Sequence, residues 1–196
     1  MGQALGANAL DQIFRTARTR NGWTDALVTP DDMRAIYDLA KMGPTSANIS
    51  PARFVWVASP EAREKLAALA IPANAPKVRQ APVTVIIGHD LDFAEKVPQL
   101  FPHNPGAKDW FEDPHFARVA AFRNGSLQGA YLMLAARALG FDCGPMSGFD
   151  NAGVDAEFFA GTRIESNFIC SIGHGTDENL FERSPRLAFE EACRIV

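Results

Sequence analysis

The stretch Gly43-Pro44-Thr45-Ser46-Ala47-Asn48-Ile49-Ser50-Pro51-Ala52-Arg53-Phe54 connects a predicted helix to a predicted strand. Its two prolines restrict the backbone, and its hydroxyl and amide side chains donate and accept hydrogen bonds over a short reach. A loop of this kind suits a planar ligand with polar edges. The same residue types are also the commonest residues of turns, so the stretch by itself favours an ordinary helix-to-strand connection.

Regular segments surround this loop. Thr29-Pro30-Asp31-Asp32 has the residues of a helix start, and that helix is expected to end at Gly43. Apolar spacing predicts further helices over 9–18, 59–70, 115–139 and 154–160, and strands over 54–58, 81–88 and 168–173. A chain of 196 residues has room for one substantial core, so we expect a single domain over residues 1–196.

Two segments depart from this pattern. Residues 90–114 are rich in proline and aromatic residues, which predicts an excursion or lid outside the core. Residues 180–196 are too weakly patterned to predict burial against the same chain. The long helix contains Gly125 and Gly129, which leave a groove for another backbone. The groove fits a helix that crosses to a second subunit and, equally well, close packing against a strand of the same chain.

The composition argues against several functional classes. A hydrophobic fraction of 47% and a charged fraction of 21% are ordinary for a globular protein. A net charge of −4 argues against nucleic-acid binding, and no apolar run reaches the roughly 18 residues of a membrane span. The first residues show no export signal, and three widely spaced cysteines indicate reduced thiols, so we expect a cytoplasmic protein.

Common catalytic motifs are missing. The nearest match to a dinucleotide fingerprint, Gly173–Glu178, lacks the third glycine. Residues 144–148, which we expect to form a turn, are one residue off the nucleophile elbow of hydrolases. The four histidines fall at no metal-ligand spacing, so we expect no metal site. A reaction here would have to draw on a cofactor for its reactive centre.

Several polar residues suit a phosphate-bearing cofactor. Arg18 and Arg20 follow the first helix, and Arg186 lies near the C-terminus. Guanidinium groups pair with phosphate oxygens through two parallel hydrogen bonds. Asn74 and Lys77 lie about one helical turn apart, which places an amide and an ammonium on one face. Exposed Arg and Lys are usually solvated, so these residues alone leave the cofactor open.

The ordered set of motifs resembles the nitroreductase family of flavin enzymes. The set is Arg18-Thr19-Arg20, Gly43–Asn48, Asn74-x-x-Lys77, Gly144–Gly148 and Arg186-Leu187. Within that family, six segments are similar to those of the malonic semialdehyde reductases, also called 3-hydroxypropionate dehydrogenases, of pyrimidine breakdown. They are Ala17–Trp23, Gly43–Arg53, Leu100–His103, Phe122–Asn124, Gly144–Asp150 and Pro185–Cys193.

The resemblance implies an α+β fold, a central antiparallel sheet flanked by helices, and an interlocked homodimer with FMN between the subunits. The tail 180–196 is then expected to embrace the partner. Phosphate contacts are implied for Arg18, Thr19, Arg20 and Arg186, with Arg183 matching the family pattern less well. Contacts to the flavin ring are implied for Asn74 and Lys77, for Pro145, Met146, Ser147 and Gly148, and, from the second subunit, for Pro44, Thr45, Ser46 and Asn48.

The activity implied is a two-step hydride transfer, from NADPH or NADH to flavin N5 and then to a small-molecule substrate. For the subfamily this substrate is malonic semialdehyde, reduced to 3-hydroxypropionate. A broad-specificity nitro or quinone reductase would use the same site, and a non-catalytic flavin-binding dimer is the alternative of a different class. A cation, His103 or Arg123, is a candidate clamp for the substrate carboxylate, although an ion pair or an exposed loop position explains each residue equally well.

Overall fold

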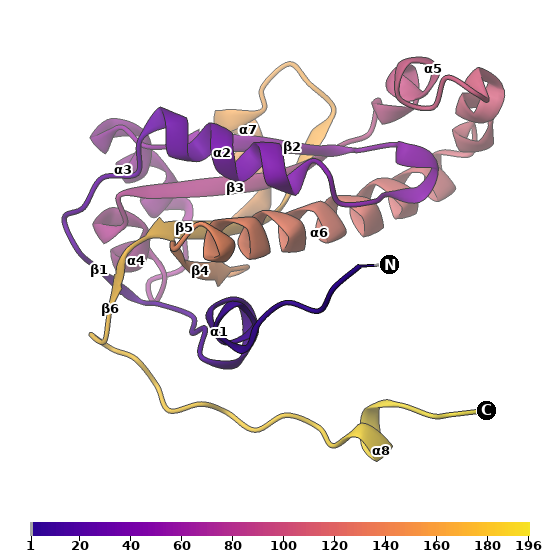
Figure 1. Ribbon diagram of the computed structural model, residues 1–196. Helices are drawn as coiled ribbons and strands as arrows, with labels where there is room; N and C mark the ends of the chain where they lie inside the picture. Colours follow the sequence, from indigo (N-terminus) through magenta and orange to yellow (C-terminus); the bar gives the residue numbers. More distant parts are fainter. Residues whose placement is uncertain (1) are drawn as a thin grey trace.

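A computed structural model gives the fold of residues 2–196, and Met1, the first residue of the predicted domain, lies outside the described residues. The central sheet has the strand order β2 (Ala52–Val57), β3 (Val83–Asp90), β5 (Ile164–Gly173) and β4 (Asp142–Met146), and each neighbouring pair is antiparallel. Strands β1 (Gly22–Trp23) and β6 (Gly175–Thr176) form a separate two-stranded sheet. The predicted α+β class with a central antiparallel sheet is confirmed (Figure 1).

Helices make up most of the remaining chain. In chain order they are α1 (Ala7–Leu10), the π-helical η1 (Asp11–Arg15), α2 (Pro30–Ala40), the 3₁₀ helix η2 (Ser46–Asn48), α3 (Pro60–Leu69), α4 (Ala75–Gln80), the 3₁₀ helix η3 (Phe93–Lys96), α5 (Val97–Leu100), the 3₁₀ helix η4 (Pro105–Phe111), α6 (Pro114–Ala138), α7 (Asn151–Phe158) and α8 (Phe189–Ala192). The predicted start of α2 is confirmed, because Thr29 and Asp32 form a capping box there. Helix α6 begins after Asp113, whose carboxylate accepts from the Phe116 amide at 2.7 Å.

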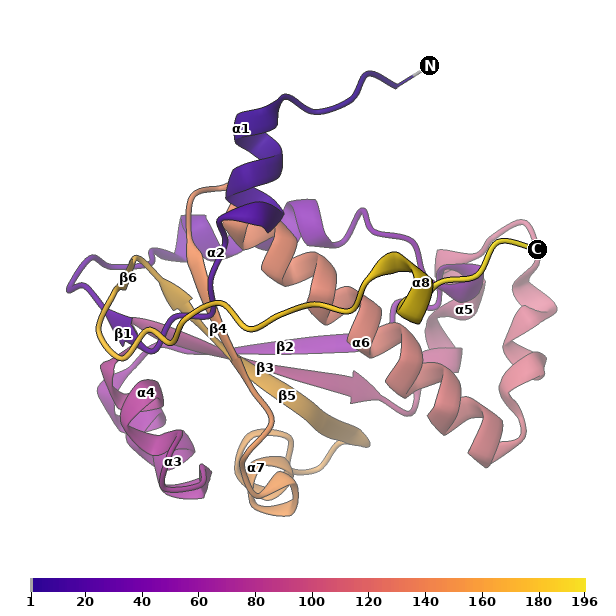
Figure 2. The same ribbon diagram turned by 90° about the horizontal axis from the view of Figure 1, so that it is seen from below.

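Both faces of the sheet are covered by helices. Val83, Val85 and Ile87 of β3 pack in one cluster with residues of α2 and α6, whereas Ile86 packs with residues of α3, α4 and α7. Successive side chains of a strand point to opposite faces, so a strand buried on both faces is apolar along most of its length. Figure 2 shows α2 on one side of the strands and α3, α4 and α7 on the other.

Several predicted boundaries were wrong. Gly144, Pro145 and Met146, predicted as part of a turn, belong to β4, and proline is tolerated there because β4 is the edge strand. Strand β5 begins at Ile164 rather than 168, and α7 begins at Asn151 rather than 154 because the Asp150 carboxylate caps it through the Gly153 amide at 3.1 Å. Helix α4 and the short strands β1 and β6 were not predicted.

The two glycines of α6 pack against the same chain. A side chain at Gly125 would approach Cβ of His89 at 3.0 Å, and one at Gly129 would approach the Phe168 ring at 2.5 Å. His89 lies on β3 and Phe168 on β5, so the glycines let α6 lie close to the sheet. Of the two alternatives for this groove, packing against a strand of the same chain is confirmed.

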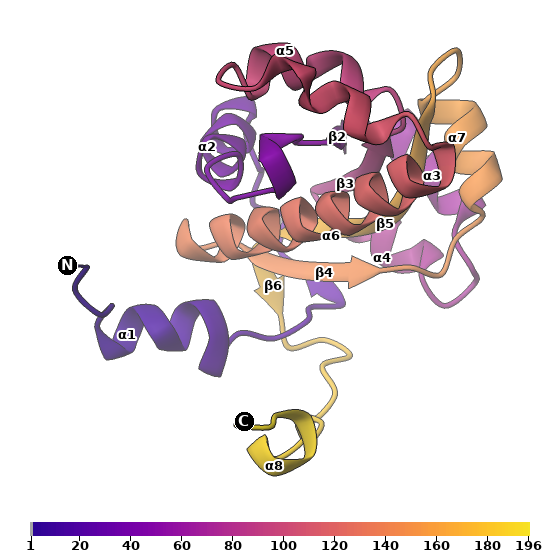
Figure 3. The same ribbon diagram turned by 90° about the vertical axis from the view of Figure 1, so that its right-hand side faces the viewer.

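Two segments lie outside the layers around the sheet. Residues 93–111 fold as η3, α5 and η4 around a small apolar cluster that includes Phe93, Val97 and Phe111. After β6 the chain runs on as a tail in which every residue from 181 to 196 is exposed. Figures 1 and 3 show this tail leaving the body. The roles of lid and partner-embracing arm stay predictions.

None of the helices within residues 2–196 combines the length and the apolar character needed to cross a bilayer.

Candidate functional site

The segment that contains Arg18 and Thr19 is fixed against the edge of the sheet. Thr19 forms a β-bridge with Cys143, and the Arg20 amide donates to the Cys143 carbonyl at 3.1 Å. The side-chain amide of the buried Asn21 donates to the carbonyl of Asn179 at 2.9 Å. These contacts bring the start of the C-terminal tail next to the segment that follows η1.

A cavity of about 430 Å³ opens between these two segments. We call it the basic cavity, and its lining is Phe14, Ala17, Arg18, Thr19, Asn21, Lys77, Arg137, Leu180, Phe181, Glu182, Arg183, Ser184 and Arg186. Five of these side chains are cationic and only Glu182 is acidic. The Nε atom of Arg137 is buried and has no hydrogen-bond partner within residues 2–196. An uncompensated group of cations with an unpaired buried donor is suited to an anionic ligand.

The arginines of the tail are held at this cavity by backbone carbonyls. Arg183 donates to the Ala17 carbonyl at 2.8 Å, and Arg18 in turn donates to the carbonyl of Phe181. Arg186 donates to the Ser184 and Pro185 carbonyls at 2.8 and 3.1 Å. No salt bridge engages these three guanidinium groups within residues 2–196, so their charge is available to a ligand.

Arg20 is engaged elsewhere. Its guanidinium contacts the carboxylates of Asp177 at 2.5 Å and Asp142 at 3.6 Å, and it donates to the Thr176 carbonyl at 3.1 Å. It does not line the basic cavity. The structure therefore brings Arg18, Thr19, Lys77 and Arg186 together at one cavity and leaves Arg20 in an ion-pair network beside them. Their contacts to a cofactor stay predictions.

Asn74 and the end of β4 also meet. The side-chain amide of Asn74, a buried residue, donates to the Gly148 carbonyl at 3.1 Å, and the Ile71 amide donates to the same carbonyl, also at 3.1 Å. A side chain at Gly148 would lie 2.5 Å from Ile71 and 2.8 Å from Asn74, so a larger residue there would displace the ends of these two side chains. Pro145 and Met146 are half-buried and Ser147 is exposed, which leaves this edge open beside the basic cavity that Lys77 lines.

The loop of residues 43–52 lies apart from these groups within one chain. Its hydrogen bonds to other elements run to α6, to residue 100 of the excursion and, through the Pro51 carbonyl, to Asp90 at the end of β3. Pro44, Ser46 and Asn48 are exposed. No hydrogen bond in the described part of the chain joins this loop to Asn74 or to residues 145–148.

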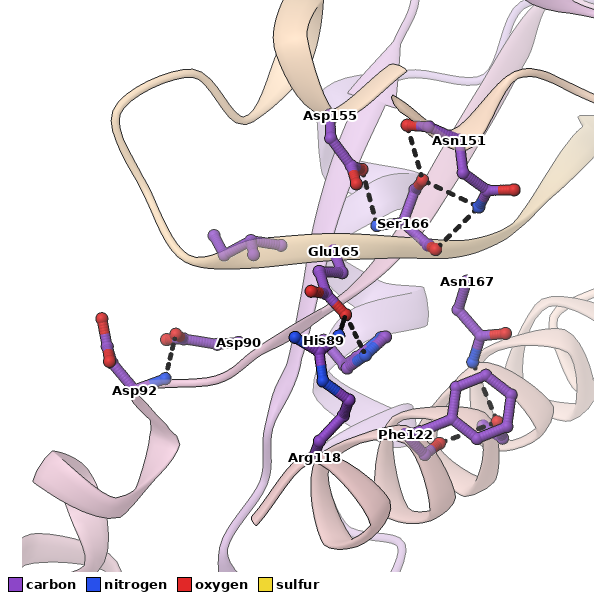
Figure 4. Close-up of polar contacts among 12 residues, drawn as sticks. His89, Asp90, Asp92, Arg118, Phe122, Asn151, Asp155, Glu165, Ser166 and Asn167 are labelled. Carbon is purple, nitrogen blue, oxygen red and sulfur yellow. Dashed lines mark hydrogen bonds and ion pairs between the residues drawn. The ribbon is translucent and has the colours of Figure 1, made fainter. Parts of the chain in front are cut away.

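A second, larger cavity of about 920 Å³ lies between the first half of α6 and the start of α7 and β5. We call it the mixed-charge cavity, and it is lined by His89, His115, Arg118, Val119, Phe122, Arg123, Ser126, Asn151, Ala152, Asp155, Glu165 and Ser166. The Glu165 carboxylate lies between Arg118, with which it forms an ion pair, and Nε2 of His89 at 3.5 Å (Figure 4). Burial lowers the pKa of His89, partly offset by the charge of Glu165.

The two candidate substrate-binding cations, Arg123 and His103, have different surroundings. Arg123 lines the mixed-charge cavity, whereas the exposed His103 packs on Phe101 with ring centroids 3.9 Å apart. The structure does not bring them to one site.

The three cysteines are free, and two of them are buried. The contact with Cys143, together with burial, raises the pKa of the Cys170 thiol. A thiol kept protonated in this way is a poor nucleophile.

Comparison with known proteins identifies the family of this chain. A sequence model described as "Nitroreductase family" matches residues 17–174, and the chain belongs to the nitroreductase family. A protein of Caulobacter sp. (strain K31), provisionally named NADH dehydrogenase/NAD(P)H nitroreductase, is 64% identical, with 98% of each chain covered. A similarly named protein of Ralstonia pickettii, HadB, is 58% identical, with 95% of this chain and 97% of its own length covered.

Solved structures share the fold at low sequence identity. A provisionally assigned nitroreductase of Exiguobacterium sibiricum, solved in complex with FMN, has a TM-score of 0.87 at 20% identity, with 100% of both chains covered. A provisionally assigned nitroreductase of Bacillus subtilis, ydfN, has a TM-score of 0.86 at 21% identity, covering 97% of this chain and 100% of its own.

Sequence reasoning missed three residues that bear on these sites. Arg137 lines the basic cavity, and Asn124 and Gln128 lie buried on the sheet-facing side of α6. A signal was present in each case. Arg137 is a lone cation in an apolar run, and the two amides occupy positions of the buried face, where polar side chains need a partner.

Proposed function

We propose that this protein is a homodimeric, FMN-dependent NAD(P)H oxidoreductase. The observation that carries the proposal is the basic cavity, in which five cations and a single carboxylate line about 430 Å³ beside the open edge formed by Asn74 and residues 145–148. A phosphate has the size and charge for such a site, and a flat ring can extend from it along that edge. The names of the relatives, and the FMN complex of the Exiguobacterium structure, agree with this assignment.

The residues present fit the cofactor part by part. Arg18, Arg183 and Arg186 supply donors for the phosphate, and Arg137 adds a buried Nε that lacks a partner within residues 2–196. The pyrimidine edge of the ring is assigned to Asn74 and Lys77. The Gly148 position, where any side chain would collide with Asn74, lets the backbone after β4 approach the ring closely. Arg20 serves in this proposal to hold the segment in place through Asp142 and Asp177 rather than to contact the phosphate.

Bound FMN supplies a ring that accepts a hydride from NAD(P)H and passes it to a second substrate. The chain contributes binding, orientation and charge. Lys77 places a cation where the reduced ring gathers negative charge, which favours reduction. A backbone amide among residues 146–148, at the end of the edge strand β4, is assigned as a donor to the ring, since Pro145 has no N–H.

The second subunit completes the site in this proposal. The loop of residues 43–52 lies apart from the basic cavity in its own chain, so its exposed Pro44, Ser46 and Asn48, together with Thr45, are assigned to the ring bound by the partner. The tail also needs a partner, because Phe181, Leu187 and Phe189 expose 77%, 70% and 56% of their surface. A tail that packs on the other chain would bury these side chains in the interface and shield Arg183 and Arg186 from solvent.

The substrate that we propose is malonic semialdehyde, reduced to 3-hydroxypropionate, because six sequence segments are similar to the reductases of that substrate. Nitroaromatic or quinone reduction is the second candidate, favoured by the nitroreductase names of relatives up to 64% identical. Arg123 remains the candidate clamp for the carboxylate, since it lines a cavity and forms no salt bridge within residues 2–196.

The first experiment tests cofactor and assembly. We expect the purified protein to be yellow, to release FMN on denaturation, to elute as a dimer and to lose its visible flavin absorbance with NADPH or NADH. Protein that stays colourless and monomeric when supplied with FMN would contradict the proposal. Protein that binds FMN without reacting with either nucleotide would point to a non-catalytic flavin-binding dimer.

The second experiment separates the substrates. Reduced enzyme is mixed anaerobically in single turnovers with malonic semialdehyde, a nitroaromatic or a quinone, and the reappearance of flavin absorbance is timed. Faster oxidation by the aldehyde supports the semialdehyde reductase, and faster oxidation by the other acceptors supports the second candidate. Arg123→Ala is then compared on the acid aldehyde and an uncharged analogue, and equal losses would exclude a carboxylate clamp.

A further inference from the structure

Three side chains of α6 hold the loop of residues 43–52. Asn124, Gln128 and Tyr131 follow one another at spacings of four and three residues, so they share one face of the helix. Each of them forms a hydrogen bond with a backbone group of the loop. In Figure 1 the connection between α2 and β2, which contains this loop, lies above α6 near the excursion.

Asn124 fixes the middle of the loop. Its Oδ1 accepts from the Ser46 amide at 2.8 Å, while its Nδ2 donates to the carbonyl of Ala120 at 2.8 Å. The second bond sets the orientation of the amide, because only the oxygen is left to face Ser46. Asn124 exposes 1% of its surface, so water does not compete for either bond.

Gln128 and Tyr131 fix the two ends. Oε1 of the buried Gln128 accepts from the Ala52 amide at 2.8 Å, at the start of β2. The Tyr131 hydroxyl donates to the Pro44 carbonyl at 3.0 Å. The Tyr131 ring also covers Gly43, where a side chain would come within 2.1 Å of the ring, so glycine is required at that position.

The loop between these points has a conformation that its own residues do not favour. Ala47, Asn48 and Ser50 have φ angles of 46°, 53° and 39°. The left-handed region is unfavourable for residues other than glycine, and of these three only asparagine enters it readily. A loop of this kind persists when its surroundings hold it, and the three α6 side chains supply those contacts.

We propose that Asn124, Gln128 and Tyr131 are positioning residues for the flavin ring. They touch neither cofactor nor substrate, and they act by holding the loop in the one conformation that presents Thr45, Ser46 and Asn48 to the ring. This inference rests on the proposed function, in which that ring is bound by the partner. Pre-organising the loop in the free protein means that FMN binding does not have to order it.

The test uses variants that remove single bonds while keeping shape. Gln128→Met removes the acceptor for the Ala52 amide, Gln128→Glu restores it, and Tyr131→Phe removes only the hydroxyl. Ser171→Ala is the matched control, because it removes the buried hydrogen bond between Thr84 and Ser171, 2.9 Å long, inside the sheet and away from the loop. Hydrogen exchange of peptides covering 44–52 is measured in the FMN-free protein, and FMN titrations and the visible circular dichroism of bound FMN follow.

We expect Gln128→Met to speed exchange in 44–52, to weaken FMN binding about tenfold and to alter the flavin dichroism. Gln128→Glu should return all three close to the wild-type values, and Tyr131→Phe should show a smaller change in the same direction. Ser171→Ala should lower the melting temperature without changing exchange in the loop or the flavin spectrum.

Unchanged exchange in 44–52, or equal weakening of FMN binding in Ser171→Ala, would overturn the inference. Wild-type protein that takes up no FMN would overturn the proposed function and the positioning role with it. Wild-type protein that binds FMN while Gln128→Met and Tyr131→Phe bind it equally well would overturn the positioning role alone.

Discussion

The basic cavity and the mixed-charge cavity differ in a way that their volumes do not suggest. The mixed-charge cavity has about 920 Å³, against about 430 Å³ for the basic cavity. In the larger one, Glu165 forms an ion pair with Arg118 and contacts His89. The Asp155 carboxylate accepts from the Ser166 amide at 2.7 Å. In the smaller one, five cations face a single acid. The candidate cofactor site is therefore distinguished by an excess of cationic over acidic side chains in its lining and not by its volume.

The largest effect is expected from removing residues 180–196. The change deletes Arg183 and Arg186 from the basic cavity and leaves the mixed-charge cavity intact. FMN affinity should fall by about a hundredfold or more, because two charge-assisted contacts are lost, and the dimer should dissociate. Fluorescence titration and light scattering measure the two effects. The thermal unfolding transition should persist, since residues 181–196 are all exposed, and unaltered FMN affinity would remove the tail from the site.

A single charge in the basic cavity should have a smaller effect. Arg186→Ala is expected to weaken FMN binding about tenfold and to leave riboflavin binding unchanged, because riboflavin has no phosphate. Titrations with both flavins measure this difference. Arg163→Ala is the control, since Arg163 is exposed and pairs with Asp92 at 2.8 Å away from the cavity. Equal losses for the two flavins would show that Arg186 acts on the fold and not on the phosphate.

In the mixed-charge cavity the effect should appear in stability against pH. The folded protein holds His89 with a lowered pKa, chiefly through burial, so the unfolded chain binds this proton first as the pH falls. Stability should therefore decline as the pH drops below about 6.5 and level off below the folded-state pKa. In His89→Leu this part of the decline should disappear in urea unfolding measured between pH 7 and pH 5. A variant that declines as steeply as the wild type would contradict this account.

The smallest change is expected from Arg118→Met. Arg118 is about half exposed, so loss of its pair with Glu165 should cost roughly 0.5 kcal/mol in urea unfolding at pH 7. The charge of Arg118 also lowers the pKa of His89, so the acid-dependent loss of stability should become slightly smaller in the variant. FMN affinity should not change, and a change would mean that the two cavities communicate.

Local patterns predicted much of this fold. The capping box at Thr29, the apolar run of β3 and the long helix α6 lie close to the expected positions because each depends on neighbouring residues. The turn prediction for Pro145 and Met146 was wrong because pairing with β5 outweighed the local turn residues. The short strands β1 and β6 depend on contacts between residues 22–23 and 175–176, which no local pattern reports.

The site shows the same division. The grouping of Arg18, Lys77 and Arg186 followed from an ordered set of motifs, and the structure places all three at one cavity. Arg20 could not be separated from Arg18 by residue type, because its partners Asp142 and Asp177 lie more than a hundred residues further along the chain. The unusual backbone angles of Ala47 and Ser50 have no counterpart in the preferences of those residue types.

The exposed apolar residues of the tail carry a consequence for how the protein responds to dilution. If two chains cover each other's Phe181, Leu187 and Phe189, the apparent free energy of unfolding of each chain increases with the protein concentration. Dilution would then release the tail of residues 180–196 from the partner first, and FMN would dissociate before the sheet unfolds. The fraction of protein that retains FMN would therefore depend on the protein concentration.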